Sequence, residues 1–287
     1  MAEYQILKVL NNNIILACLL STSEEMVLVG KGIGFGQKEN KVISIPNDKI
    51  QKSYKAYDSS TKDEYLRLID YLDGEILGIS EEIISRAEKK LGKLNSHIHI
   101  ALTDHISFAL DRLKMGMEIN NPFLNEIKTL YSEEYSVALS SANFLTEKLG
   151  ISIPEAEVGF MALHFHSSLQ NKKVKDTVKN TRLLRESIDI IEADTGYDVT
   201  KDSLIYSRLV NHLKLAISRV ENGKSFENVL LATIKTKFKK SFETAKKVGK
   251  HLEASLSIAI SEDELGYMAL HIERVKNFME TSLLKDS

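Results

Sequence analysis

The chain has 287 residues, of which 43% are hydrophobic and 27% are charged, and its formal net charge is −2. These proportions are ordinary for globular proteins, and the length suggests about two domains. The near-neutral charge excludes indiscriminate binding to nucleic acid, and no stretch approaches the ~18 apolar residues of a membrane span. The N-terminus lacks the layout of a signal peptide, and the single Cys18 excludes an intrachain disulfide and a multi-cysteine metal site. We therefore expect a cytoplasmic protein without direct membrane insertion.

Residues 1–57 alternate short β-rich runs with turn-forming clusters. The runs are YQILKVL, IILACLL, MVLVG and KVISI. They predict four strands with hairpin connections, and hence a small antiparallel sheet. Because a domain of about 55 residues buries little surface by itself, we expect this sheet to dimerise.

The stretch LVGKGIGFGQ at residues 28–37 has a glycine at every second position from Gly30 to Gly36. It matches neither G-x-G-x-x-G nor G-x-x-x-x-G-K-[ST], and no helical pattern follows it. A period of two is typical of a strand. On that interpretation one face carries Lys31, Ile33 and Phe35, and the other face is bare backbone that RNA or a second subunit can approach.

From about residue 60 the hydrophobic spacing becomes helical. Ser60 and Thr61 resemble a capping box, and Ser80 is expected to cap a helix over EEIISRAEKKLG that ends at Gly92. Helical spacing continues to about residue 170. The sequence therefore predicts an all-α region after the sheet.

An internal repeat organises this region. IPEAEVGFMALH at 153–164 recurs as ISEDELGYMALH at 260–271, and we call the shift that carries Ile153 onto Ile260 the repeat offset. Other similar residues recur at the same offset. The repeat predicts two homologous helical-bundle domains, over about 64–170 and 171–287, after the β domain at 1–57.

Four of the eight histidines obey the repeat: His105 pairs with His212, and His164 with His271. Each repeat thus holds two histidines that are distant in sequence and lie on different predicted helices. Imidazole changes protonation near neutral pH, and its nitrogens can accept a proton, a metal or a phosphoryl group. Helical spacing places His105 near the edge of an apolar stripe and His164 further from one, where a partner can reach them.

Two other interpretations of these histidines stay open at this point. They can fill equivalent structural niches, bonded to backbone or helix ends. They can also bind zinc, but no cysteine assists, and the His-x-His pairs at 97/99 and 164/166 have no counterparts in the second repeat. We therefore expect no metal site and no cofactor.

The chain resembles the transcriptional antiterminators of the bacterial sugar phosphotransferase system. The resemblance covers essentially the whole chain and rests on six motifs in order, which are KVLNNN at 8–13, VGKGIGF at 29–35, TDHI around His105, EVGFMALH ending at His164, NHL around His212 and ELGYMALH ending at His271. KGIGF is most similar to the subgroup that controls the glucose permease.

The resemblance implies that the N-terminal domain dimerises and grips a hairpin in a messenger leader, which prevents a terminator hairpin from forming. Lysines can pair with phosphates, asparagine amides can form hydrogen bonds with base edges, and an aromatic ring can stack on an unpaired base. Phe35 could instead belong to a core, and Asn11–Asn13 could simply form a turn. The matching positions are Lys8, Asn11, Asn13, Gly30, Lys31, Gly32 and Phe35.

Charge limits how such a domain can bind. Residues 1–57 carry seven lysines and five acids, a net charge of +2. Even a dimer would release few counterions on binding. Specificity must then depend on hairpin shape, stacking and base contacts.

The resemblance also implies a switch. In this family the sugar permease and the small histidine phosphocarrier protein phosphorylate histidines of the helical domains, here His105, His164, His212 and His271. Phosphorylation of the first domain generally inactivates these proteins, whereas phosphorylation of the second domain activates some relatives and matters little in others. The two repeats differ near these positions: Asp104 precedes His105, whereas Asn211 precedes His212.

Two rival functions remain. A DNA-binding regulator can carry the same histidine domains, but its N-terminus would contain a helix-turn-helix rather than strands. An enzyme that relays phosphate onward would use the same imidazoles. No nucleotide motif, paired catalytic carboxylates or nucleophile arrangement accompanies them, so we expect no catalytic residues.

Overall fold

The computed structural model describes residues 2–30, 32–50, 52–55, 72–221, 223 and 226–283. The expected linker near 58–62 and the capping box at Ser60 and Thr61 lie outside these residues. The chain divides into two compact units, one of residues 1–122 and 133–174, the other of residues 123–132 and 175–287. The segment 123–132, which the repeat assigns to the first helical domain, is thus grouped with the second unit.

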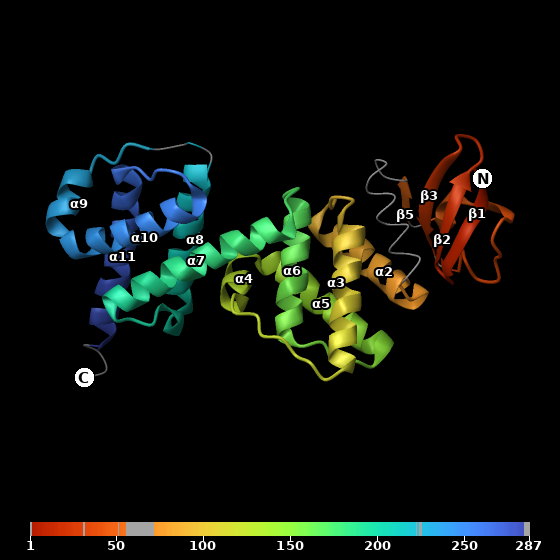
Figure 1. Cartoon of the computed structure of the whole chain (residues 1–287), viewed down its shortest axis with the longest axis horizontal. Helices are drawn as coiled ribbons and strands as arrows, with labels where there is room; N and C mark the ends of the chain where they lie inside the picture. Colours follow the sequence, from red (N-terminus) through yellow and green to blue (C-terminus); the bar gives the residue numbers. More distant parts are fainter. Residues whose placement is uncertain are drawn as a thin grey trace. The chain divides into compact units, whose positions relative to one another are not determined.

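The N-terminal part forms an antiparallel sheet with strand order β4-β1-β2-β3-β5 (Figure 1). The four expected strands are confirmed, and a fifth that the sequence pattern missed pairs with β3. The described residues of this part hold strands and a single-turn helix, η1 (Asn47–Lys49), rather than a helix-turn-helix. The strands are β1 (Ala2–Asn11), β2 (Ile14–Leu19), β3 (Glu24–Val29), β4 (Val42–Ile45) and β5 (Lys52–Lys55).

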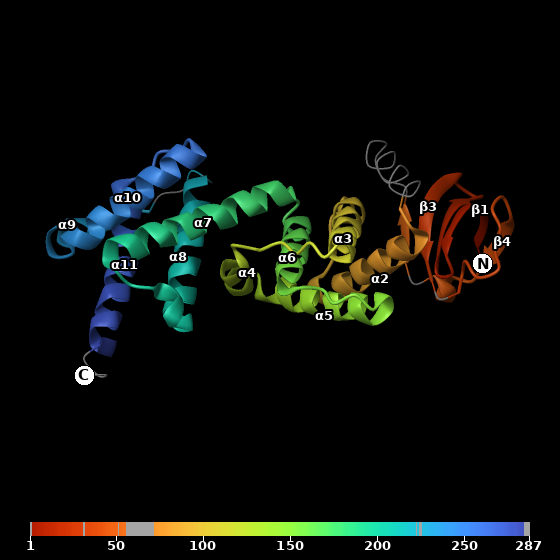
Figure 2. The same ribbon diagram turned by 60° about the horizontal axis from the view of Figure 1, so that its bottom comes forward.

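Period-two alternation gives this sheet two buried faces. Ile14 and Leu16 of β2 pack with Leu77, a residue of helix α2 (Gly74–Leu91). Ile15 and Ala17, which point to the opposite face, belong to a second cluster that includes Ile33 from the glycine run. The first turn of α2 therefore packs against one face of the sheet within the same unit (Figure 2).

Helix α2 begins earlier than expected. Its N-cap is Asp73, whose side chain accepts a hydrogen bond from the backbone of Glu75 at 2.7 Å. Ser80 is fully buried inside the helix, so the prediction that it is a cap was wrong, whereas Gly92 does end the helix. Gly74 lets the helix meet the sheet, because a Cβ there would lie 2.3 Å from the carbonyl oxygen of Leu10.

The helical repeat predicted from sequence is present in three dimensions. The short helix and the helix after it recur at the repeat offset, as α4/α9 and α5/α10. In the first unit α3 packs against α6, and in the second unit α8 packs against α11. The remaining helices are α3 (Ile98–Lys114), α4 (Leu124–Leu130), α5 (Ser132–Leu149), α6 (Glu155–Leu169), α7 (Val174–Thr195), α8 (Ser203–Glu221), α9 (Leu231–Lys237), α10 (Lys239–Leu256) and α11 (Glu262–Leu283), with a 3-10 turn η2 (Val199–Lys201).

Candidate functional site

The glycine run forms a loop of successive turns, so its interpretation as a regular strand was wrong. Strand β3 ends at Val29, and the backbone of Phe35 donates to the carbonyl of Gly32 at 3.2 Å, as in a tight turn. Gly32 and Gly36 have φ of +73° and +67°, the left-handed region that glycine adopts at no steric cost. Ile33 and Phe35 consequently do not share a face, since Ile33 is 6% exposed and Phe35 72% exposed.

The hairpin turn between β1 and β2 holds this loop in place. Asn13 accepts hydrogen bonds from the backbone of Gly30 through its carbonyl and from that of Gly32 through its Oδ1, both at 2.9 Å. Gly30 admits no side chain, because a Cβ would lie 2.1 Å from the carbonyl oxygen of Lys49. The structure thus brings Asn13, Gly30 and Gly32 together, and it gives the Asn13 side chain a role in the loop.

Of the other expected RNA-binding positions, the structure describes the side chains of Phe35 and Lys8. Phe35 projects its ring into solvent rather than into a core. Lys8 lies on β1 at an irregularity of the pairing between Ile6 and Lys8, and bulges of this kind redirect side chains. Lys31 and the side chain of Asn11 lie outside the described residues.

The first histidine pair lies between two packed helices. His105 on α3 and His164 on α6 have ring centroids 4.9 Å apart. The Nε2 of His105 also lies 3.3 Å from Oε2 of Glu157, a carboxylate that is 2% exposed. Arg112 donates to the other oxygen of this carboxylate at 2.7 Å. Burial would raise the pKa of Glu157, but His105 and Arg112 outweigh it and lower that pKa, so the carboxylate stays ionised.

The second pair repeats this arrangement with closer rings. His212 on α8 and His271 on α11 stack with centroids 3.4 Å apart and an interplanar angle of 17°. Arg219 donates twice to the carboxylate of Glu264, at 2.8 and 2.6 Å. Glu264 is 1% exposed. In both repeats, then, an arginine of one histidine-bearing helix holds a buried carboxylate of the other.

These surroundings keep three of the four imidazoles neutral. Burial, and then the neighbouring ring of His105, lower the pKa of His164 well below its ordinary value. Burial, followed by His212 and two arginines, lowers the pKa of His271 to about 4, and burial together with the same arginines lowers that of His212. A neutral imidazole has a free nitrogen lone pair at physiological pH. The chemistry open to such a group is nucleophilic attack or proton acceptance.

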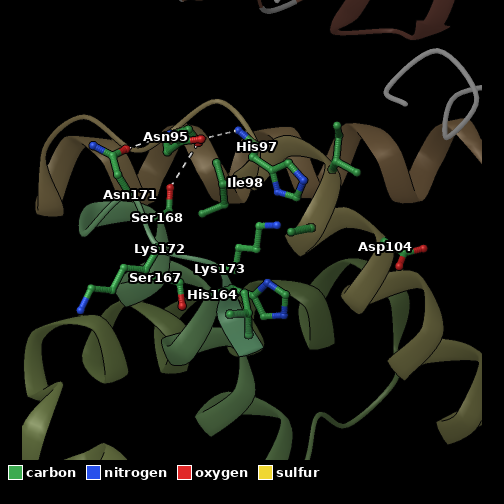
Figure 3. Close-up of a pocket in the computed structure, with 13 residues that line it drawn as sticks. Asn95, His97, Ile98, Asp104, His164, Ser167, Ser168, Asn171, Lys172 and Lys173 are labelled. Carbon is green, nitrogen blue, oxygen red and sulfur yellow. Dashed lines mark hydrogen bonds between the residues drawn. The ribbon is translucent and has the colours of Figure 1, made fainter. Parts of the chain in front are cut away.

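Each pair borders a pocket. In the first unit a pocket of 640 Å³ is lined by His164, with Lys172 and Lys173 beside it and Asp104 at its edge (Figure 3). In the second unit a pocket of 300 Å³ is lined by both rings of the pair, His212 and His271. At least one imidazole of each repeat therefore faces a pocket.

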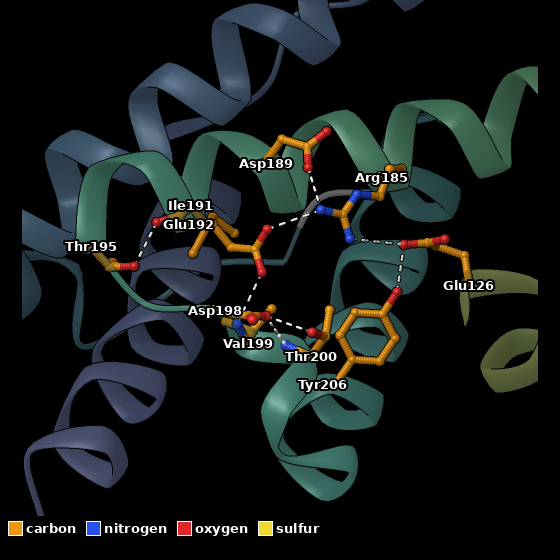
Figure 4. Close-up of polar contacts among 10 residues, drawn as sticks. All are labelled: Glu126, Arg185, Asp189, Ile191, Glu192, Thr195, Asp198, Val199, Thr200 and Tyr206. Atoms are coloured by element: carbon orange, nitrogen blue, oxygen red, sulfur yellow. Dashed lines mark hydrogen bonds and ion pairs between the residues drawn. The ribbon is translucent and has the colours of Figure 1, made fainter. Parts of the chain in front are cut away.

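A buried polar network anchors the helix that carries His212 (Figure 4). Tyr206, on α8, donates to Oε1 of Glu126 on α4 at 2.5 Å. Arg185 on α7 lies 3.5 Å from the same oxygen and also contacts Asp189 and Glu192. Burial and the bond to Glu126 raise the pKa of Tyr206, so the phenol remains a donor. Glu126 is 1% exposed and thus depends on these partners.

Sequence reasoning found the histidines but missed the polar residues that join the helices carrying them. The repeat offset relates Arg112 to Arg219, and it also relates Glu157 to Glu264. Asn121 and Asn228 obey it as well, and each donates to a backbone carbonyl at the start of the following histidine helix, at 3.2 and 3.3 Å. A search for polar residues at this offset would have found all three pairs.

The part of the chain that the structure describes contains neither a metal-binding cluster nor a membrane-spanning helix. No group of three or more histidine, cysteine or acidic side chains there could hold a metal ion. None of the helices in these ranges is long and apolar enough to cross a membrane.

Comparisons with known proteins agree with this organisation. Residues 4–63 match the family model "CAT RNA binding domain", and residues 81–168 and 185–275 each match "PRD domain". The chain is 34% identical over 275 residues to "Transcription antiterminator LicT" of Bacillus subtilis, covering 94% of this chain and 98% of that protein. It is also 34% identical to "Protein GlcT" of Staphylococcus epidermidis, covering 95% and 96% of the two chains. The solved structure "Crystal structure of GlcT CAT-PRDI" superimposes with a TM-score of 0.52 at 41% identity, covering 59% of this chain and 99% of that one.

Replacing Glu126 by alanine should destabilise α7 and α8. Tyr206 and Arg185 would lose a buried acceptor, at a cost of about 1–3 kcal/mol. Asp189→Ala is the matched control, because this carboxylate contacts the same arginine. Its side chain is 52% exposed, so the loss of its ion pair should lower the free energy of unfolding by less than about 1 kcal/mol. Hydrogen exchange of the amides in α7 and α8 measures both. Equal effects of the two substitutions would contradict this account of Glu126.

The second histidine pair should make stability depend on pH. In the folded chain the pKa of His271 is about 4, below its unfolded value of 6.5, so the unfolded state binds more protons between these limits. The contribution of His271 to the free energy of unfolding is therefore fully present above about pH 6.5, and it decreases as the pH falls toward 4. The loss from pH 7 to 5 should be about 1 kcal/mol, after allowance for the partial exposure of the ring. Denaturant unfolding at a series of pH values tests this, and His271→Gln should reduce the slope. An unchanged slope in that variant would count against it.

Proposed function

Because the chain belongs to the family of transcription antiterminators that combine a CAT RNA-binding domain with PRD domains, we propose that it is a sugar-responsive antiterminator controlled by histidine phosphorylation. It binds a hairpin in a leader messenger RNA as a homodimer and prevents a terminator hairpin from forming. The sugar is glucose, and the phosphoryl donors are the sugar permease and the small histidine phosphocarrier protein of the phosphotransferase system. It acts in the cytoplasm and catalyses no reaction itself.

One observation carries the regulatory part of this proposal. In each repeat the imidazole rings of two histidines that are distant in sequence lie next to each other. Their ring centroids are 4.9 Å apart in the first repeat and 3.4 Å apart in the second. The pKa values of His164, His212 and His271 are lowered, and each pair borders a pocket. A neutral ring nitrogen can attack the phosphorus of a donor phosphohistidine. The new N–P bond forms as the donor's N–P bond breaks, and the electron pair stays with the donor imidazole.

The effect of phosphorylation follows from charge. A phosphoryl group adds nearly two negative charges and three strong acceptors. In the first repeat this charge arises beside Glu157, which lies 3.3 Å from the ring of His105, so it repels a buried carboxylate. We propose that this repulsion opens the first PRD domain, or its interface with a second copy, and that the sheet dimer then releases RNA.

The RNA-binding surface centres on the loop after β3. Phe35 offers an exposed ring, and Asn13, Gly30 and Gly32 are the expected contacts that belong to this loop or are bonded to it. Since residues 1–57 have a net charge of only +2, stacking and shape supply most of the specificity.

Replacing Phe35 by alanine should weaken binding of the leader hairpin by about 5- to 100-fold, the loss expected for one base stacked on an aromatic ring. Phe226→Ala is the control, since this phenylalanine is also exposed, at 59%, but lies in the second unit. Gel-shift or fluorescence titration with the hairpin at fixed salt measures both affinities. If Phe35→Ala binds as tightly as the wild type, the loop is not the RNA-binding surface.

Alanine substitution of the first histidine pair should abolish sugar control. His105→Ala and His164→Ala remove acceptors of an inhibitory phosphoryl group, so readthrough in a terminator-reporter strain should become constitutive without sugar. His251→Ala is the matched control, because it lies outside the repeat and pairs with Glu186. Sugar dependence that survives in both first-repeat variants would refute the inhibitory role of these histidines.

A further inference from the structure

The pockets beside the two histidine pairs occupy equivalent places in the repeat but differ in charge. His164 and His271 are equivalent lining residues, and so are Ile98 and Ile205. The second pocket also contains Arg208 and Arg274. The equivalent positions of the first pocket are occupied by two uncharged residues, Ala101 and Ser167.

Both arginines lie one helical turn from a histidine. Arg208 precedes His212 by four residues on α8, and Arg274 follows His271 by three residues on α11. At these spacings two side chains lie on the same face of a helix. The two helices therefore direct two guanidinium groups and two stacked rings to one pocket, and none of the described residues that line it is acidic.

These guanidinium groups also differ from the other arginines. The structure describes seven arginines, and five of them form ion pairs with carboxylates: Arg86, Arg112, Arg182, Arg185 and Arg219. Arg208 and Arg274 form none with any residue in the described ranges. Both described arginines that lack a carboxylate partner thus lie in the same pocket, next to the proposed phosphoryl acceptors.

We propose that the second pocket is an oxyanion site in which Arg208 and Arg274 hold the phosphoryl group of a phosphorylated His212 or His271. The inference rests on the proposed function. Guanidinium groups donate paired N–H bonds that match the spacing of phosphoryl oxygens, and such charge-assisted bonds are about twice as strong as neutral ones. The group arrives by attack of a neutral ring nitrogen on the donor phosphohistidine, whose N–P bond breaks with its electron pair left on the donor imidazole.

The first pocket should hold a phosphoryl group less firmly. Its cations are Lys172 and Lys173, which follow α6, and the carboxylate of Asp104 lines the same pocket. A lysine ammonium is a strongly hydrated point charge without the paired donors of arginine. The two repeats are therefore expected to differ in their affinity for the same chemical group, with the second repeat favouring the phosphorylated state.

A phosphoryl-transfer equilibrium tests this in the full chain. The chain is mixed with phosphorylated and unphosphorylated phosphocarrier protein at fixed ratios, and occupancy of each histidine is read by mass spectrometry. Arg274→Ala and Arg208→Ala should each lower the equilibrium constant for the second pair by about tenfold. The equilibrium constant of Arg274→Lys should lie between those of the wild type and Arg274→Ala. The occupancy of the first histidine pair should not change in any of these variants. Arg182→Ala is the matched control, an arginine of the same unit that pairs with Glu186.

The outcomes separate the two proposals. If the second pair takes up the group with an unchanged equilibrium constant in the arginine variants, the oxyanion site is refuted and the proposed function stands. If none of the four histidines is phosphorylated in the wild type, both fail. Inorganic phosphate is titrated in parallel, followed by the ring signals of His212 and His271. Arginine-dependent binding of free phosphate without any effect on transfer would assign the pocket to the free anion and overturn its role in holding phosphohistidine.

Discussion

The ion pair between a buried glutamate and an arginine of the neighbouring helix is the contact on which both histidine sites depend. Glu157 and Glu264 are 2% and 1% exposed, and a buried carboxylate is tolerated only when it is paired. Arg112 and Arg219 supply the partner from the helix that carries the other histidine of each pair. Because each ion pair joins α3 to α6 or α8 to α11, it fixes the position of one helix along the other. The two imidazoles of each repeat then meet although they are distant in sequence.

The glutamate–arginine ion pair has different neighbours in the two repeats. This difference is consistent with opposite responses of the two repeats to histidine phosphorylation. In the first repeat Glu157 is shared between Arg112 and the ring of His105, so new negative charge on that ring acts against a carboxylate that cannot move into water. In the second repeat Arg219 holds Glu264 through two bonds, and Arg208 and Arg274 remain to meet a new anion. Phosphorylation would therefore strain the first repeat and be accommodated by the second. This supports the proposal that phosphorylation of the first PRD domain is inhibitory and that the second PRD domain tolerates or uses the phosphoryl group.

Much of this arrangement could be predicted from the sequence, because an internal repeat carries spatial information. The repeat offset identified four histidines, and the structure brings each pair together.

The glycine run was misread because alternating glycines fit either a strand or a series of turns, and only the bonds to Asn12 and Asn13 decide between them. Strand β5 was missed because QKSYK has no apolar run, and its pairing with β3 is a tertiary contact. Ser80 was mistaken for a cap because two acids follow it, whereas Asp73 provides the cap about two turns earlier. The attachment of Glu126 to Tyr206 joins residues 80 positions apart, which no local pattern reveals.

The central claim is that the four repeated histidines, and no others, are where the phosphotransferase system acts on this chain. The most direct measurement is site-by-site mapping of phosphohistidine, by mass spectrometry under conditions that preserve the N–P bond, after incubation with phosphorylated permease domain and phosphocarrier protein. The account predicts phosphoryl groups among His105, His164, His212 and His271, and none on His97, His99, His166 or His251. Phosphorylation confined to the second set, or absent from all eight histidines, would contradict it.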